Sequence, residues 1–354
     1  MSYLLKKLYY NFLKISKYLG LFEISKLITS RKLRILCYHN FSSNCDLVNW
    51  QPGLHITPET FKKRIEYIHK SNYCVLQLDD AVRLLKDKNC NHNLPVVITI
   101  DDGWSNILKS AHKILHDYEI KYTVYLTSWY CKNNYPIFNL AVPFVLWKAE
   151  KNGFELKKIN IPIKINDDKL YHHDFLSKII IDYANENLSI NDSYELLTNI
   201  CNQVMFDYND LYENKELSLV DRYELEHLVN DGVDIQLHTH THRWPQDGDA
   251  ADLEISKNRL FIEGMTNKRS DHLCYPSGIW DKSQFEYLDK NKIKSAVTCD
   301  DGLNDYNTNV YTLHRLLDSE DKQQIVFEAE LSGFIFILNK IGIFKIAKMI
   351  HIKY

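Results

Sequence analysis

Residues 96–104, with the sequence VVITIDDGW, constrain the fold of this chain more than any other stretch. Four of the first five residues are β-branched aliphatics, which predicts a strand buried on both faces, as in a parallel sheet. Asp101 and Asp102 follow at once and therefore fall at the carboxyl end of this strand. Neighbouring carboxylates beside apolar residues repel each other and lose hydration, so a divalent cation or strong hydrogen-bond donors should compensate them. The alternative for this pair is a surface turn or a helix cap.

Residues 235–242 contain candidate ligands for such a cation. This stretch runs from apolar residues into three histidines, and His238 and His242 have the spacing that lets two imidazoles reach one metal ion. One Asp and two His with positions left open for water are typical of a catalytic metal site. Alternatively, the histidines are ordinary polar groups at a strand end. His240 shares the side of His238 if the chain stays extended, and points away if the chain turns.

Apolar runs that suit strands alternate with stretches that suit helices along most of the chain. Thr57 is expected to cap one helix, with Pro58 at its first position. This alternation predicts a parallel α/β sheet or barrel. Residues 150–216 interrupt it and are expected to form an insertion of mixed strand and helix. The strands are expected at residues 33–39, 74–76, 96–100, 122–126, 235–238, 272–275 and 295–298.

Length, charge and cysteine usage bound the class of protein. A chain of 354 residues can hold one large α/β domain with appendages or two average domains. The net charge of −3 gives no support to nucleic-acid binding, so no nucleic-acid partner is expected. Eight cysteines without a C-x-x-C pair resemble neither a zinc cluster nor a disulfide framework, which favours reduced thiols in a cytosolic protein.

Both ends of the chain are basic and have apolar residues at helical spacing. Residues 1–35 contain eight Lys or Arg against one acid, Glu23. The amphipathic segment 1–32 can lie on an anionic membrane face, or it can be a helix docked on the body of its own protein. Residues 321–354 are expected to form a basic helical tail that could contact the same membrane.

Neither a signal peptide nor a membrane span is expected. Lysines interrupt the apolar N-terminal segment, and no small-residue cleavage site follows it. No stretch reaches the roughly 18 uncharged apolar residues that a membrane span needs. We therefore expect a cytoplasmic protein, free or peripheral on the cytoplasmic face of the membrane.

Three short motifs occur in order, each at an expected strand end. Residues 99–103, TIDDG, resemble the T-F-D-D-G motif of the polysaccharide deacetylases, the NodB-homology group of carbohydrate esterases. Residues 238–242, HTHTH, are similar to that family's H-[ST]-x-x-H motif, and residues 274–278, CYPSG, resemble its third motif in the Y-P-x-G form. The resemblance covers residues 33–320. It implies an α/β fold, an irregular (β/α) barrel of about seven parallel strands, with the site at their carboxyl ends.

The resemblance also implies how the motif residues act. Asp102, His238 and His242 would hold a divalent metal, with Zn²⁺ as the expected ion. The metal would polarise an acyl carbonyl and activate a water molecule. Asp101 would be the general base that takes a proton from this water, and a nearby cation would keep it ionised.

Further residues are expected to border the substrate. The backbone N–H of Ser277, which follows Tyr275 and Pro276, would donate to the oxyanion of the tetrahedral intermediate. His39 and Trp104 sit where they could line the sugar pocket, although packing roles are an equal alternative for both.

The third motif departs from the family pattern. Many members have an arginine two residues before the motif's proline, where this chain has Cys274. Arg315 could supply the missing guanidinium. His314 is the candidate for the family's general acid, with a packed or solvent-facing histidine as the alternative.

The resemblance implies a metal-dependent hydrolase that removes an N- or O-acetyl group from a carbohydrate. The expected substrate is a surface-polysaccharide or lipid-linked glycan precursor. One alternative is a catalytically inactive carbohydrate-binding protein on the same fold. A sugar deformylase would differ only in its pocket, whereas a phosphate esterase would need more cationic residues near the metal than the sequence offers.

Overall fold

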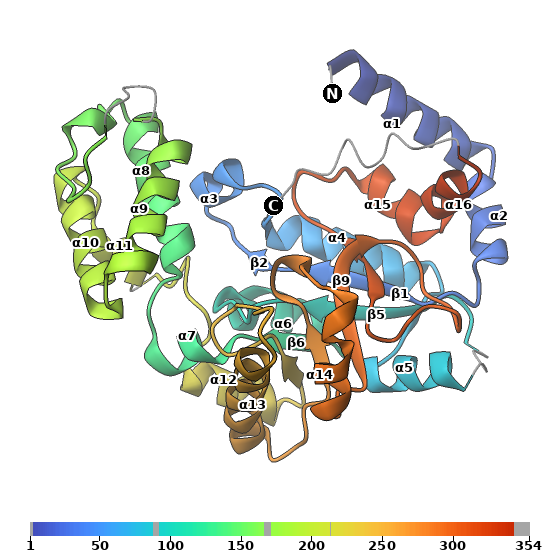
Figure 1. Ribbon diagram of the computed structural model, residues 1–354. Coiled ribbons are helices and arrows are strands. Elements are labelled where there is room, and N and C mark those ends of the chain that lie inside the picture. The colour runs from blue at the N-terminus through green and yellow to red at the C-terminus, as the bar shows by residue number, and fades with distance from the viewer. Residues whose placement is uncertain (1–2, 88–91, 166–170, 213, 343–354) are drawn as a thin grey trace.

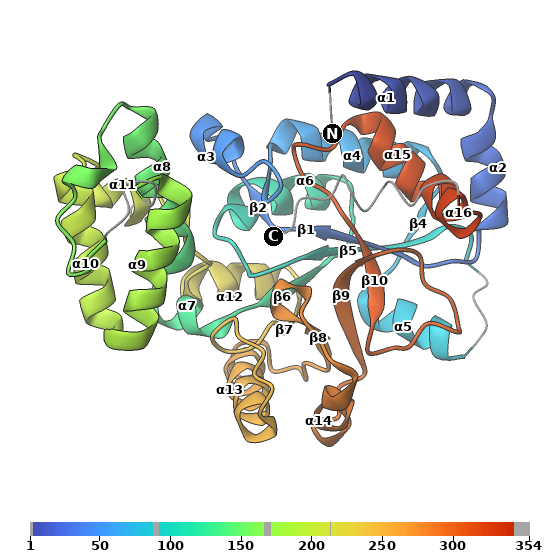
Figure 2. The same ribbon diagram turned by 45° about the horizontal axis from the view of Figure 1, so that its top comes forward.

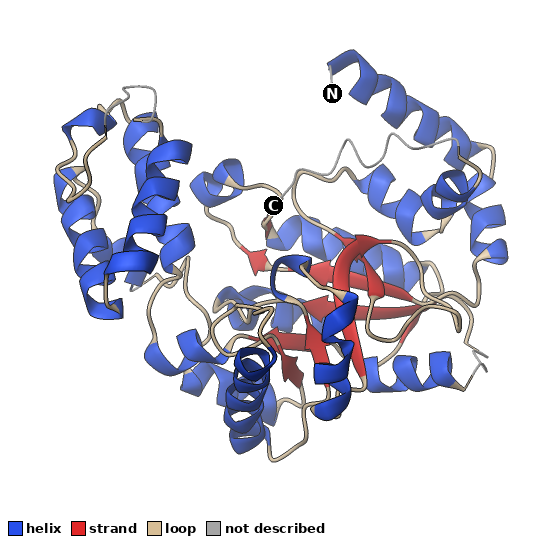
Figure 3. Cartoon of the chain, viewed as in Figure 1, coloured by secondary structure: helices blue, strands red, loops and turns tan. Residues whose placement is uncertain are grey.

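The computed structural model describes residues 3–87, 92–165, 171–212 and 214–342, and every structural statement below refers to these residues. Seven parallel strands form a ring in the order β1-β10-β9-β8-β7-β6-β5, which a pairing of β5 with β1 closes (Figures 1 and 3). The predicted irregular barrel of about seven parallel strands is thereby confirmed. Its strands are β1 (Arg34–Tyr38), β5 (Pro95–Ile100), β6 (Thr123–Leu126), β7 (Asp234–Leu237), β8 (His272–Cys274), β9 (Ser295–Asp301) and β10 (Leu313–Leu317).

Three further strands lie beside the ring. β4 (Cys74–Val75) pairs with β5 outside the barrel, and β2 (Asn40–Phe41) pairs with β3 (His55–Ile56) in a separate two-stranded sheet.

Side chains alternate between the two faces of each barrel strand, and this alternation decides what points inward. On β5, Ile98 and Ile100 pack in the large core between barrel and helices, whereas Val97 packs in the small core inside the barrel. Asp101 lies four residues after Val97, so its side chain points to the same side as that of Val97, into the barrel. We call such inward-pointing positions of a strand its inward row.

Helices between the strands surround the barrel. Thr57 caps one of them by accepting the backbone N–H of Thr60, and Pro58 occupies its first position, as predicted. The α-helices are α3 (Cys45–Trp50), α4 (Pro58–Lys70), α5 (Leu78–Lys86), α6 (His112–Asp117), α7 (Ser128–Asn133), α12 (Arg222–Asn230), α13 (Gly248–Thr266) and α14 (Phe285–Lys290). Other elements are a π-helical turn (Ile107–Ala111) and 3₁₀ turns (Leu156–Lys158, Pro276–Gly278, Lys282–Gln284).

A helical insert, defined as α8 to α11, stands beside the barrel (Figure 1). A tilted ring contact between Trp50 and Phe144 and an ion pair between Asp46 and Lys151 connect it to α3. The prediction of mixed strand and helix over residues 150–216 was wrong about the strands, because the described part of this stretch contains helices and turns only. The four helices are α8 (Phe138–Lys151), α9 (His173–Asn187), α10 (Ile190–Gln203) and α11 (Tyr208–Tyr212).

The two ends of the described chain pack together on another side of the barrel (Figure 2). Leu13, Phe22 and Phe334 share a buried cluster there. The predicted N-terminal helix is divided at Gly20, whose φ of 76° starts a new helix. The elements concerned are α1 (Tyr3–Tyr18), α2 (Leu21–Ile28), α15 (Gln324–Leu331) and α16 (Phe334–Lys340).

The predicted C-terminal tail is described only up to residue 342, and its last twelve residues lie outside the described ranges. Within the ranges given above, none of the helices has the length and apolar character needed to cross a membrane.

The chain turns sharply after β5, and Gly103 makes this turn possible. Asp102 and Gly103 both have positive φ, 67° and 88°. A Cβ atom on Gly103 would lie 2.4 Å from Cδ1 of Leu126, which is itself fully buried on β6. The turn therefore needs the conformational freedom of glycine and its lack of a side chain.

Gly103→Ala is expected to destabilise the protein more than Gly232→Ala does. Both glycines have positive φ, so both variants carry a backbone penalty of about 1–2 kcal/mol. The space around Gly232 is open, whereas Gly103→Ala adds an overpacking cost of about 1–3 kcal/mol. Urea unfolding midpoints of both variants measure the difference, and equal midpoints would contradict the role given to Gly103.

Candidate active site

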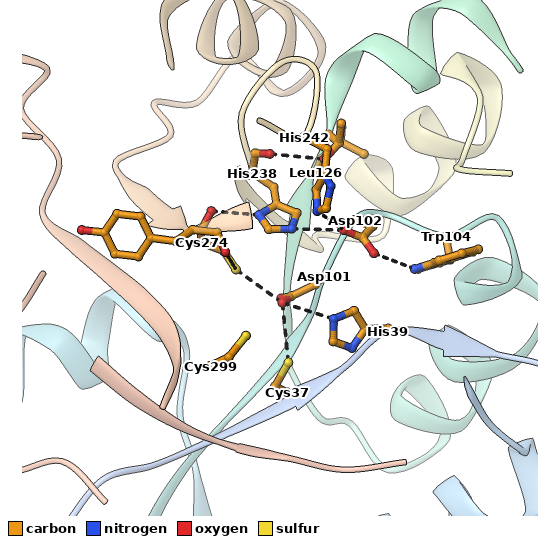
Figure 4. A network of polar contacts seen from close by, with 12 residues as sticks. Cys37, His39, Asp101, Asp102, Trp104, Leu126, His238, His242, Cys274 and Cys299 are labelled. Atoms are coloured by element: carbon orange, nitrogen blue, oxygen red, sulfur yellow. Dashed lines mark hydrogen bonds and ion pairs between the residues drawn. The ribbon is translucent and has the colours of Figure 1, made fainter. Parts of the chain in front are cut away.

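Asp102, His238 and His242 meet at the carboxyl ends of β5 and β7 (Figure 4). The Nε2 atoms of His238 and His242 lie 3.1 and 3.3 Å from Oδ1 of Asp102. One ligand atom from each residue lies within 4.8 Å of the others. Ligands at about 2.0–2.2 Å from a tetrahedral Zn²⁺ are roughly 3.4 Å apart. The donor types and spacing of these three residues, the metal-site group, therefore fit a divalent metal ion.

Neighbouring groups orient the metal-site group. The backbone carbonyl of Cys274 lies 2.8 Å from Nδ1 of His238. Because a carbonyl can only accept, Nδ1 carries a proton, and Nε2, on the side of Asp102, is the atom that would bind a metal ion. Trp104 donates its indole N–H to Oδ2 of Asp102 at 3.0 Å, and the backbone N–H of His238 donates to the buried Asn258 at 3.0 Å. These contacts hold the ligand atoms before any metal binds.

The histidine segment turns after His238, which decides where His240 points. Thr239 and His242 have positive φ, 64° and 59°, so the segment does not stay extended. Nδ1 of His240 lies 2.9 Å from the hydroxyl of Ser128, away from the other two histidines. The structure therefore realises the second of the two alternatives for His240.

Asp101 forms a buried bidentate ion pair with Arg315. Nη1 of Arg315 donates to Oδ1 of Asp101 and Nη2 donates to Oδ2, both at 2.7 Å, and neither side chain is more than 2% exposed. Arg315 follows Leu313 in the inward row of β10, as Asp101 follows Val97 on β5. The guanidinium that the third motif lacks thus reaches this carboxylate from another strand.

Thiols fill the remaining space around this ion pair. The Sγ atoms of Cys274 and Cys37 lie 3.3 and 3.5 Å from Oδ2 of Asp101 (Figure 4). Cys299 lies 3.8 Å from Arg315. Sequence reasoning did not find Cys37 or Cys299, because a lone cysteine carries no local pattern.

The ion pair and the histidines determine the charges of the site. Burial alone would raise the pKa of Asp101, but Arg315 outweighs burial and lowers the pKa to about 2. Burial also opposes ionisation of Asp102, and its hydrogen bonds to the two histidines hold its pKa well below the usual range. Burial lowers the pKa of His39, whose Nε2 lies 3.8 Å from Asp101. Both carboxylates are therefore charged at neutral pH.

Three residues expected near the substrate lie elsewhere. Trp104 is fully buried, and its indole N–H is bonded to Asp102. Pro276 is also buried. His314 precedes Arg315 on β10, and neighbouring residues of a strand face opposite sides, so its side chain points away from the barrel interior. Trp104 therefore contacts a metal-site residue, and none of the three belongs to the described residues that line the cavity at this site.

A cavity of about 900 Å³ opens at the metal-site group. His39, Tyr275 and Ser277 line it, together with both carboxylates and both metal-site histidines. The cavity also reaches α8, α9 and α10 of the helical insert. Sequence analysis did not predict that the helical insert lines the cavity, because its lining residues form no motif.

Comparisons with known proteins identify the family of this chain. The sequence model of the family described as polysaccharide deacetylase matches residues 88–296, which is more than half of the chain. The chain therefore belongs to the polysaccharide deacetylase family. A curated relative, YxkH of Bacillus subtilis, is named in the same family and is 27% identical over 95 residues, which cover 27% of this chain and 32% of YxkH.

Solved structures share the fold. The Streptococcus pyogenes deacetylase PplD, in complex with acetate, aligns with a TM-score of 0.55 and 14% identity over 83% of this chain and 95% of that chain. IcaB from Ammonifex degensii aligns with a TM-score of 0.52 and 13% identity over 85% and 97%. Because the sequence identities are this low, these alignments show only that the folds are similar.

Trp104→Phe is expected to weaken metal binding about 10–100-fold, because it removes a hydrogen bond to a ligand carboxylate while it keeps a buried ring. Competition with a chelator measures the affinity for Zn²⁺. Trp280→Phe is the matched control, since the indole of Trp280 donates to the carboxylate of Asp300, which does not belong to the metal-site group. Equal affinities of the two variants would show that Trp104 does not tune the ligand.

Proposed function

We propose that this protein is a metal-dependent hydrolase that removes an N- or O-acetyl group from a carbohydrate. The observation that carries the proposal is the metal-site group beside the ion pair of Asp101 and Arg315, on the wall of an open cavity. Membership of the polysaccharide deacetylase family supports the same reaction. Ligands, a base and space for a substrate meet at one end of the barrel.

Asp102, His238 and His242 would hold the ion, with Zn²⁺ as the expected metal. When bound, such an ion polarises the acyl carbonyl and lowers the pKa of a water ligand towards neutrality. Asp101 accepts the proton of the attacking water, and Arg315 holds both of its oxygens in place. The protonated carboxyl can then pass the proton on to the leaving nitrogen or oxygen, which restores the carboxylate that Arg315 stabilises.

Cavity-lining residues complete the proposed site. Among the described residues, the backbone N–H of Ser277 has no acceptor, so it can donate to the oxyanion. His39 and Tyr275 border the acyl group or the sugar ring.

The purified protein is expected to bind about one Zn²⁺ at the metal-site group and to release acetate from acetylated sugars. The double variant His238→Ala, His242→Ala should lose both properties. Asp101→Asn should keep the metal and lose acetate release by about 10²–10⁴-fold, because the carboxylate takes the proton. Metal analysis, acetate assays and circular dichroism of all three proteins measure these outcomes.

Two results would contradict the proposed reaction. Absence of metal after addition of Zn²⁺ would favour a carbohydrate-binding protein. Full acetate release by Asp101→Asn would remove Asp101 from the role of base.

We also propose that the enzyme works at the cytoplasmic face of the membrane, on a surface-polysaccharide or lipid-linked precursor. Leu4, Leu8 and Ile15 share one face of α1 at helical spacing, and Leu19 follows directly after the helix. All four are more than half exposed, while Leu13 docks the helix on the protein. The same segment is basic, which suits anionic lipid headgroups.

A triple variant, Leu4→Gln, Leu8→Gln and Ile15→Gln, is expected to reduce flotation with phosphatidylglycerol vesicles by about tenfold or more, because exposed apolar area is lost. Folding should persist, since these side chains are exposed. The control is Leu253→Gln, Leu260→Gln on α13, where both leucines are also exposed. Equal flotation of the two variants would contradict membrane binding through α1.

A further inference from the structure

The cavity extends beyond the metal-site group into the helical insert. Its far wall is lined by residues 137–140, 184, 185, 188, 190, 193 and 194. A cavity of about 900 Å³ is at the upper end of the range for small-molecule sites, which is about 300–1,000 Å³. The acetylated sugar ring at the metal would therefore leave space next to the insert.

The far wall is mostly apolar. Leu140, Leu188 and Ile190 contribute aliphatic side chains, and Phe138 and Tyr194 contribute rings. Its polar side chains, apart from the hydroxyl of Tyr194, are those of Asn139, Asn185 and Ser193. None of the described residues that the insert contributes to the cavity is charged. Aliphatic groups cannot bond to sugar hydroxyls, so most of this wall offers no partner to a polar glycan, and its described residues offer no cation to a phosphate.

The far wall is also preformed. Tyr135 stacks between Trp129 of α7 and Tyr194 of α10, with ring centroids 6.2 and 4.1 Å apart. The hydroxyl of Tyr194 donates to the carbonyl of Pro136 at 2.7 Å. These contacts fix the insert against the segment that follows β6, so the apolar surface exists before a substrate arrives.

We call the part of the cavity along the far wall the second compartment. We infer that it binds an uncharged apolar group carried by the acetylated sugar, such as an alkyl, acyl or isoprenoid chain. The inference rests on the proposed function, because the sugar end of the substrate is placed by the metal-site group. The compartment is continuous with the catalytic cavity, so an apolar aglycone on the sugar enters it directly. Ile190 is 51% exposed, and such an aglycone would cover it.

The test compares octyl and methyl glycosides of N-acetylglucosamine below the micelle concentration, with the Zn²⁺-loaded full chain. Each buried methylene strengthens binding about fourfold, so kcat/KM for acetate release should be at least tenfold higher for the octyl glycoside. Leu188→Asn, Ile190→Asn should remove this preference. Leu253→Asn, at an exposed leucine on α13, is the matched control and should retain it.

Calorimetric binding of both glycosides separates this inference from the proposed reaction. Octyl-selective binding that the double variant loses supports the compartment even if no acetate is released, and the absence of acetate would then count against the reaction. Equal use or equal binding of the two glycosides would overturn the inference and leave the reaction intact. A stronger preference for an acetylated oligosaccharide would also overturn it and assign the compartment to further sugar units.

Discussion

The two buried carboxylates at the end of β5 set the conditions for the rest of the site. A buried charge without a partner costs several kcal/mol, so neither carboxylate is stable alone. Asp101 finds its cation on β10, in Arg315, and Asp102 faces imidazoles from the end of β7. Because these partners come from strands on different sides of the ring, closure of the barrel and assembly of the site depend on each other.

The turn after β5 lets two adjacent residues serve two separate purposes. Asp101 stays in the inward row of its strand and is held as a carboxylate by the guanidinium. Asp102 has positive φ, and its oxygens face the histidines and the indole of Trp104. In the proposed function, one carboxylate serves as a proton acceptor and the other as a metal ligand. Gly103 permits this division, because a side chain there would collide with β6.

The barrel and the segments added to it have different tasks. The carboxyl ends of the strands hold the groups of the proposed hydrolysis, whereas the helical insert after β6 forms the far wall of the cavity. α1 lies on another side of the molecule (Figures 1 and 2), and several of its apolar side chains are exposed. Enzymes commonly place their catalytic groups on a rigid scaffold and use added segments to recognise the substrate.

The sequence by itself predicted a parallel α/β sheet or barrel, and the resemblance of its motifs to a known family favoured the barrel and pointed to Asp101, Asp102, His238 and His242. Local features sufficed for these, because strand periodicity and short motifs act over a few residues. Only the tertiary structure decided that Arg315, 214 residues after Asp101, forms the ion pair with it. It likewise decided that His240 turns away, that Trp104 and His314 stay out of the cavity, and that the insert forms a wall. Such outcomes depend on backbone turns, on the facing of a strand and on contacts between distant segments, and local patterns specify none of these.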